Sequence, residues 1–245
     1  MLEIDHISFS YGRRRVIDDL SFDVAPGEIV ALTGANGVGK TTLLQILANL
    51  LIQDTGNIRL DGVDPLERPI RYRRGIGYLS EMCPLYDEMT VEAYLTYRVR
   101  LKGERTLRIR RRVSEALELC GLDKVGREPV RLLSQGYRKR LSLADALALR
   151  PKVLLLDDPL AGLDAQLRRR LGAMLSAISS RSAVVVAGHE IQEMLGWCTR
   201  VVLLRTGGSA LFYRTGEHSR EALTEQVGRQ VAADTGEEEA CVPST

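Results

Sequence analysis

The chain has 245 residues, of which 44% are hydrophobic and 27% are charged, and its formal net charge is +2. This length suits one large domain or two small ones, the hydrophobic content excludes global disorder, and the near-neutral charge excludes an extensive nucleic-acid-binding surface. The four cysteines show no Cys-x-x-Cys spacing, which excludes a disulfide framework and a cysteine-based zinc site.

The first third of the chain predicts strands joined by short turns. Alternating or nearly all-apolar patterns indicate strands at residues 2–8, 20–24, 29–33, 58–60 and 76–79. The 29–33 segment is almost entirely apolar, as is typical of a strand buried on both faces. A glycine-rich turn follows it, and helical periodicity then runs over residues 42–51.

The rest of the chain changes from helices to alternating strands and helices. Helical patterns cover residues 90–122, with a break at Gly103, and residues 134–149, ending before Pro151. Beyond them, strands are predicted at residues 153–157, 183–187 and 201–204, alternating with helices at residues 167–179 and 191–197. This alternation predicts an α/β fold with a mainly parallel sheet flanked by helices, an N-terminal antiparallel β subdomain and an inserted helical subdomain at about 85–150.

The domain boundary is expected near the end of the chain. A hairpin-like piece at residues 210–213 and a short helix at residues 220–231 are the last patterned segments. We therefore expect one domain over residues 1–230 and a flexible acidic tail over residues 231–245, where three consecutive glutamates occur.

A phosphate-binding loop is the strongest motif. The sequence matches G-x-x-x-x-G-K-[ST] between a buried strand and a helix, the context that this motif requires. The segment consists of Gly34, Ala35, Asn36, Gly37, Val38, Gly39, Lys40, Thr41 and Thr42. Backbone N–H groups and the helix N-terminus would bind phosphate, Lys40 would meet the β- and γ-phosphates, and Thr41 would bind Mg²⁺. The motif predicts ATP or GTP binding.

Further motifs, which follow one another along the sequence, distinguish among the protein families that share this phosphate-binding loop. The segment 133–137 reads Leu-Ser-Gln-Gly-Tyr, the strand 153–157 ends in Asp157, and Asp158 follows it directly. Asp164 and His189 come later, and Tyr11 precedes the loop. With these motifs the sequence resembles the ATP-binding-cassette ATPases over about residues 1–205.

The resemblance implies a role for each motif residue. Tyr11 would stack on adenine, Thr41, Glu81 and Asp157 would bind or order Mg²⁺, and Asp158 and His189 would be catalytic. Ser134, Gln135 and Gly136 would form the signature sequence that completes the site of a second subunit, and Asp164 would belong to the D-loop. In the family two subunits pair head to tail around ATP. In isolation each residue also has an ordinary structural interpretation: Ser134 and Asp157 as helix caps, Tyr11 as a hairpin cover and His189 as a surface or satisfied core residue.

Two positions depart from the family pattern. Asp158 stands where the family has the glutamate that polarises the attacking water, and its side chain is one methylene shorter. Because a misplacement of about 1 Å can lower a rate roughly 10²-fold, we expect ATP binding with slow hydrolysis. Glu81 replaces a glutamine that binds Mg²⁺. Glu81, the segment 84–86 and the Leu-Ser-Gln-Gly signature are similar to the export-type ABC-2 branch.

The expected function is an ATP-hydrolysing subunit of a transporter, working with a separate integral membrane permease and a second copy or homologous nucleotide-binding subunit. No apolar stretch is long enough to cross a bilayer and residues 1–10 lack a secretory signal, so we expect a cytoplasmic protein held at the inner face of the membrane by its permease. Pro84, Leu85, Tyr86 and Met89 are candidates for permease contacts or for ordinary packing.

Two alternatives remain open at this point. One is a soluble cassette ATPase that remodels a nucleic-acid or protein assembly, although no nucleic-acid partner is expected from the charge. The other is a different phosphate-loop enzyme, which explains the loop but not Ser134, Asp164 and His189 together. The arginine clusters at residues 13–15, 71–74 and 108–112 are either solvated surface or contacts with nucleotide, lipid headgroups or a partner.

Overall fold

The computed structural model describes residues 1–217 and 219–235. Its strands are β1 (Leu2–Tyr11), β2 (Arg14–Val24), β3 (Ile29–Thr33), β4 (Thr55–Leu60), β5 (Ile76–Leu79), β6 (Val153–Asp157), β7 (Ala183–Ala187), β8 (Arg200–Leu204) and β9 (Ala210–Arg214). Its helices are α1 (Lys40–Leu47), α2 (Pro69–Arg74), α3 (Val91–Leu101), α4 (Thr106–Leu119), α5 (Gln135–Leu147), α6 (Ala165–Ser179), α7 (Ile191–Met194) and α8 (Arg220–Thr235). Short 3₁₀ turns lie at Asp123–Val125, Val130–Leu132 and Thr215–Glu217.

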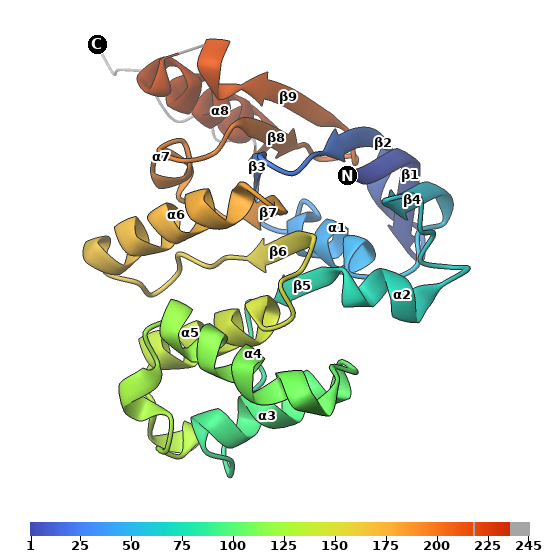
Figure 1. Ribbon diagram of the computed structural model, residues 1–245. Coiled ribbons are helices and arrows are strands. Elements are labelled where there is room, and N and C mark those ends of the chain that lie inside the picture. The colour runs from blue at the N-terminus through green and yellow to red at the C-terminus, as the bar shows by residue number, and fades with distance from the viewer. Residues whose placement is uncertain (218, 236–245) are drawn as a thin grey trace.

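The strands form two sheets, as Figure 1 shows. The larger sheet has the order β5-β6-β7-β3-β8-β9 and is parallel except for β9, which runs antiparallel to β8. The smaller sheet is antiparallel, with the order β2-β1-β4. Helices α3, α4 and α5 form a separate group beside the larger sheet (Figure 1). This is the predicted α/β fold with an antiparallel N-terminal part and inserted helices.

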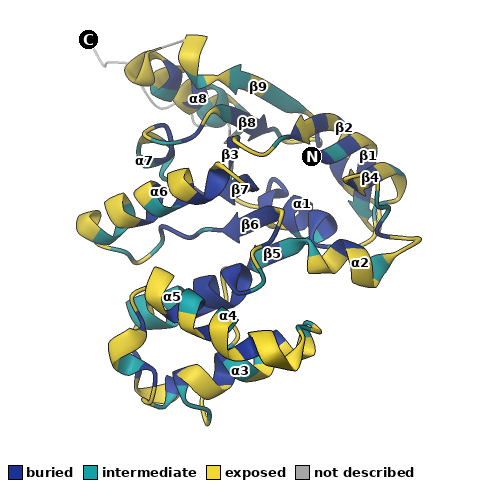
Figure 2. Cartoon of the chain, in the orientation of Figure 1, coloured by how far each residue is buried: buried dark blue, intermediate teal, exposed yellow. Residues whose placement is uncertain are grey.

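The larger sheet divides the interior into two apolar cores. Because successive side chains of a strand point to opposite faces, Ile29 and Ala31 of β3 belong to one core and Val30 and Leu32 to the other. The first core includes the helices α3 to α6, and the second includes α1 and the antiparallel sheet. Figure 2 shows the central strands buried and the outer faces of the helices exposed. The parallel strands are thus held from both sides, which fixes the edge where they end.

The helical group is joined by a charge cluster as well as by apolar packing. The Asp145 side chain on α5 is 9% exposed and accepts from Arg98 Nη2 at 2.9 Å and Lys102 Nζ at 2.7 Å. Burial lowers the pKa of Lys102, and the charge of Asp145 opposes this shift. Asp145 therefore compensates two partly buried cations, Arg98 on α3 and Lys102 just after it.

We predict that Asp145→Asn destabilises the protein by about 2 kcal/mol, because it leaves two partly buried cations without their counter-charge. Urea unfolding followed by circular dichroism measures the change. Glu225→Gln is the matched control, since it breaks the exposed pair between Glu225 and Arg229 and should leave the midpoint almost unchanged. An equal effect of the two substitutions would contradict the role given to Asp145.

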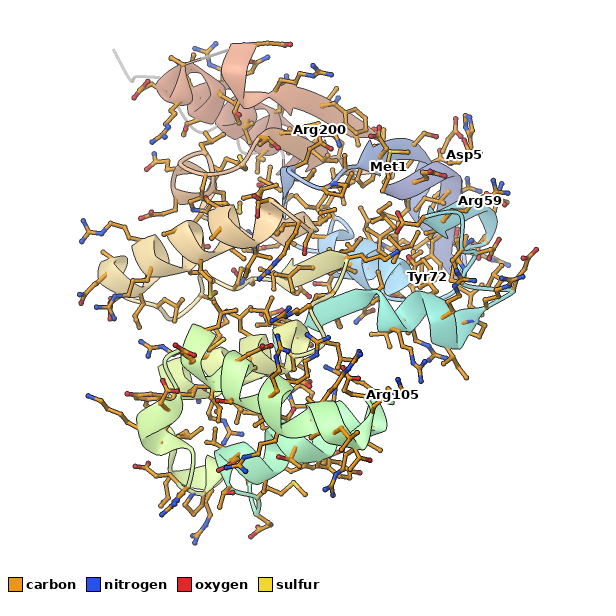
Figure 3. All side chains as sticks on the ribbon, viewed as in Figure 1. Met1, Asp5, Arg59, Tyr72, Arg105 and Arg200 are labelled. Atoms are coloured by element: carbon orange, nitrogen blue, oxygen red, sulfur yellow. The ribbon has the colours of Figure 1, made fainter. Side chains whose placement is uncertain are left out.

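Several segments differ from the sequence-based expectation: α1 covers Lys40–Leu47 rather than residues 42–51, β1 extends to Tyr11, and β4 begins at Thr55. Helix α2 was not predicted, β2 begins at Arg14 rather than at residue 20, and α7 ends at Met194 rather than at residue 197. Helix α2 is held by Tyr72, whose buried hydroxyl donates to Leu47 O at 2.8 Å (Figure 3). Helix α7 does not continue beyond Met194. Instead, Gly196 N donates a hydrogen bond to Glu193 O, which closes a tighter turn.

The end of α8 differs from the expectation of a flexible tail over residues 231–245. Residues 231–235 continue α8. The end of this helix is stabilised by Arg205, whose Nη2 donates a hydrogen bond to Asp234 Oδ1 at 2.7 Å. Residues 236–245 lie outside the described part of the chain. Among the described residues no helix is both long and apolar enough to cross a membrane. Cys83, Cys120 and Cys198 are free, and Cys241 is not described.

Candidate functional site

The phosphate loop leaves the end of β3 and enters α1, and its glycines are required by close contacts. Gly34 has φ 141°, and a Cβ there would lie 2.4 Å from Leu204 O. Gly39 has φ 121°, and a Cβ there would lie 2.6 Å from Val16 Cγ1. Any side chain at either position would strain the backbone and clash with its neighbour. The glycines of the sequence motif at positions 34 and 39 are therefore required by the conformation of this turn.

The loop and its lysine form a cationic cradle. Among the described residues no acceptor bonds the N–H of Gly37 or of Gly39. Lys40 is 8% exposed, and its Nζ donates to Gly34 O at 2.8 Å and to Ala35 O at 3.0 Å. Burial lowers the pKa of Lys40, whereas the nearby carboxylates raise it. Unpaired N–H groups beside a desolvated ammonium group are suited to bind an anion.

Asp157 faces this cradle from the end of β6. It is 4% exposed, the Thr41 hydroxyl lies close enough to lower its pKa, and its Oδ2 has no hydrogen-bond partner among the described residues. Burial is the main cause that raises the pKa of Asp157; the charges of Glu81 and Asp158 add to the increase, and Thr41 and Lys40 oppose it. An unpaired buried carboxylate oxygen beside a hydroxyl is a fitting donor set for a hard cation such as Mg²⁺.

Asp158 lies next to Asp157 but adopts an unusual backbone conformation. Its φ is 47°, in the left-handed region that Asp and Asn tolerate better than most residues. Its Oδ1 is buried without a partner and lies 3.7 Å from the position where Gly188 would carry a Cβ. Burial raises the pKa of Asp158, and the charge of Glu190 raises it further. A carboxylate with a raised pKa is a better proton acceptor than an ordinary aspartate.

Three further residues, Lys139, His189 and Glu190, influence the carboxylate of Asp158 at the end of the sheet. The charges of Lys139 and His189 lower the pKa of Asp158, so both lie near its carboxylate, and His189 is exposed just after β7. Lys139 Nζ donates to Asp158 O at 2.5 Å and to Ala161 O at 3.0 Å. Glu190 pairs with Arg168 at 3.4 Å, and its Oε2 is buried without a partner. Sequence reasoning missed Lys139 and Glu190, because neither lies in a motif.

Glu81 belongs to the same electrostatic group. It is exposed just after β5, and its charge affects the pKa of Lys40, Asp157 and Asp158. It also lines a cavity of about 520 Å³ with Gln135, Lys139 and Gly162. Thr41 and Glu81, two of the predicted metal residues, thus both influence the pKa of the third, Asp157. The described residues contain no group of three His, Cys, Asp or Glu side chains arranged to hold a metal ion.

The signature segment is not bonded to the phosphate loop of its own chain among the described residues: no hydrogen bond or ion pair joins Ser134 or Gly136 to that loop. Ser134 occupies the N-cap position of α5, but it is exposed and its side chain makes no capping hydrogen bond. Its hydroxyl and the start of α5 are thus available to another molecule. Asp164, by contrast, caps α6 by accepting from Leu167 N at 2.9 Å.

Tyr11 ends β1 beside the loop. Its side chain is 51% exposed, and its ring contacts Phe9 edge to face at 4.9 Å. One face of Tyr11 therefore covers the hairpin while the rest of the ring is open to solvent. The exposed part of the ring is accessible for the predicted stacking on adenine, and the contact with Phe9 is the one expected if Tyr11 covers the hairpin.

Comparisons with known proteins agree with this geometry. A family model described as ABC transporter matches residues 17–161. The sulfate/thiosulfate import ATP-binding protein CysA of Methylococcus capsulatus is 40% identical over 212 residues, which cover 84% of this chain and 61% of that protein. The chain thus spans less than two thirds of the length of that relative.

Two solved structures share the fold. A structure described as the ATP binding subunit of an ABC transporter has a TM-score of 0.84 and 24% identity, covering 95% of this chain and 99% of that one. A bacterial ABC transporter cassette solved as a dimer has a TM-score of 0.78 and 23% identity, covering 88% and 99%. At these identities the two structures establish similarity of fold.

Proposed function

This chain belongs to the ABC transporter family, and from that premise we propose that it is the ATP-binding and ATP-hydrolysing subunit of a transporter. The observation that carries the proposal is the meeting of Lys40, Asp157 and Asp158 where β3 and β6 end. A desolvated cation and unpaired N–H groups face two carboxylates with raised pKa values. Such a site is suited to bind a polyphosphate together with its cation, as expected for a member of the ABC transporter family.

Each residue has a distinct proposed task in the reaction. The N–H groups of the loop and Lys40 bind the phosphates, and Thr41, Asp157 and Glu81 hold Mg²⁺ or its water. Bound Mg²⁺ would neutralise charge on the phosphates. Asp158 orients the attacking water and accepts its proton, with His189 beside it. Because Asp158 is shorter than glutamate, we propose that hydrolysis is slow.

The signature segment supports a paired arrangement. Ser134 has a hydroxyl free of capping bonds at the start of α5, so the helix dipole and this hydroxyl can bind an anion of another subunit. We propose that residues 1–230 act as one nucleotide-binding domain that pairs head to tail with a second copy or a homologous subunit. The dimeric cassette of similar fold supports this pairing.

The segment after β5 is the proposed contact with a membrane permease. Met82 is 89% exposed and Tyr86 is 49% exposed, and the Tyr86 ring contacts Tyr94 and Tyr97 on α3. Pro84 is exposed as well, and like Tyr86 it is suited to contact the permease. Leu85 and Met89 instead pack against the core, so they have the ordinary packing role. An exposed cluster of aromatic and thioether side chains suits a protein interface.

The permease would hold the subunit at the inner face of the membrane. Membership of the export-type ABC-2 branch is part of the proposal, supported by Glu81 and the segment 84–86. The sulfate and the import direction in the name of the relative belong to that protein. The comparisons support a transporter subunit over the soluble assembly-remodelling ATPase that was the alternative.

Affinity purification of the full chain from membranes tests this proposal. We expect an integral membrane subunit to be recovered, and we expect Tyr86→Asp to reduce its recovery by at least about tenfold, as for loss of an interface hot spot. Leu107→Asp is the control, because Leu107 is 98% exposed on α4, outside the proposed contact. Recovery of ribosomes or DNA in place of a membrane subunit would refute the proposal.

A further inference from the structure

Three consecutive arginines lie between Tyr11 and the phosphate loop, and the structure separates them. The hairpin turns at Gly12 and Arg13, so that Arg14 already belongs to β2 and pairs in register with Tyr11. Directly opposed residues of an antiparallel pair project to the same side of the sheet. Arg14 is therefore the arginine that shares a side with the proposed adenine-stacking residue.

Arg14 also contacts the phosphate loop itself. Its Nη2 donates to Gly37 O at 3.1 Å and lies 4.0 Å from the position of a Gly37 Cβ. Because C=O and N–H of a trans peptide point in opposite directions, the N–H of Val38 points away from Arg14, and it donates to Ala35 O at 3.4 Å. The contact thus orients one peptide unit of the cradle.

Among the described residues, no carboxylate forms an ion pair with Arg14. The bond to Gly37 O is the one hydrogen bond that the Arg14 side chain makes in the described part of the chain. The neighbouring Arg15 instead pairs with Asp18. A guanidinium group has several N–H donors in a planar fork that matches phosphate oxygens, so Arg14 carries unused donors at the edge of an anion cradle.

We infer that Arg14 is a further nucleotide-binding residue, which binds phosphate oxygens of the nucleotide from the outer edge of the loop while it holds the Gly37–Val38 peptide in place. The inference rests on the proposed nucleotide-binding function. The hairpin then supplies two contacts to one ligand: Tyr11 to the base and Arg14 to the phosphates. The chemical class recognised is a nucleoside di- or triphosphate.

Calorimetric titration of the full chain with Mg-ATP, Mg-ADP and AMP tests this role. A charge-assisted hydrogen bond of ordinary strength predicts that Arg14→Gln weakens ATP binding by about tenfold at low salt. AMP binding should weaken less than about twofold, because AMP brings fewer phosphates to the loop. Arg14→Lys should retain most of the ATP affinity.

Salt and two neighbouring variants separate phosphate binding from simple anchoring of the loop. The loss in Arg14→Gln should shrink at high salt, because screening weakens the attraction between Arg14 and the phosphates, whereas it has little effect on the short-range hydrogen bond to Gly37 O. Arg13→Gln and Arg15→Gln remove the same charge nearby and should change ATP affinity less than about twofold. A loss that does not depend on salt, or an equal loss in these controls, overturns the inference while leaving the proposed function intact. Failure of the unmodified chain to bind ATP overturns both.

Discussion

Asp158→Glu is expected to raise the steady-state rate of ATP hydrolysis by about tenfold to a hundredfold, because a longer side chain brings the carboxylate about 1 Å closer to its working position. Oδ1 of Asp158 lies near Gly188, whose missing Cβ removes one obstacle to a longer side chain, with Met194 as the other neighbour there. Phosphate release at saturating Mg-ATP measures the rate. An unchanged or lower rate would contradict the idea that the short carboxylate limits hydrolysis.

The backbone at this position calls for a matched control. Asp158 has φ 47°, and glutamate tolerates the left-handed region less well than aspartate, so the substitution carries some strain. Asp19 has φ 51° on β2 and pairs with His6, away from the site. Asp19→Glu should therefore cause similar strain without changing the hydrolysis rate. The difference between the two variants isolates the effect on catalysis.

Lys40→Met is expected to weaken ATP binding by about a hundredfold, because it removes the one full charge that the loop places against the phosphates. The fold should persist, since methionine retains the apolar stem and the burial that lowers the pKa of Lys40 penalises its charge. Binding is measured by titration and the fold by thermal unfolding.

Lys152→Met serves as the control for this prediction. Lys152 pairs with Asp61 and its side chain is 63% exposed, so its loss should leave ATP affinity unchanged. Equal ATP affinities of Lys40→Met and the unmodified chain would mean that the nucleotide binds elsewhere. Unfolding of Lys40→Met alone would contradict the expectation that Lys40 acts on the ligand more than on the fold.

Strongly patterned segments were predictable from the sequence. The buried strand β3, the glycine-rich loop and α1 follow one another in the printed sequence, and the glycines are those that the turn requires. The fold class and the meeting of Lys40 with Asp157 follow from the same logic, because parallel strands end at a common edge. Helix α2 was missed because Tyr72 is its one buried residue, which leaves no periodic signal.

The parts of the site that were missed depend on contacts with the backbone. Lys139 reaches the carbonyl oxygens of Asp158 and Ala161, and a carbonyl acceptor places no demand on residue type. The left-handed conformation of Asp158 is equally invisible in the sequence. Arg14 could be noticed only as one of three arginines until the start of β2 and its bond to Gly37 were known.

The central claim is that one Mg-ATP binds per chain between the phosphate loop and the carboxylates at the end of β6. Calorimetric titration of the unmodified full chain with ATP, with Mg²⁺ and then with excess chelator, tests it most directly. We expect one nucleotide per chain and an affinity that falls when Mg²⁺ is removed, because Asp157, Asp158 and Glu81 then repel the uncompensated phosphates. Absence of ATP binding, or an affinity that rises on removal of Mg²⁺, would contradict it.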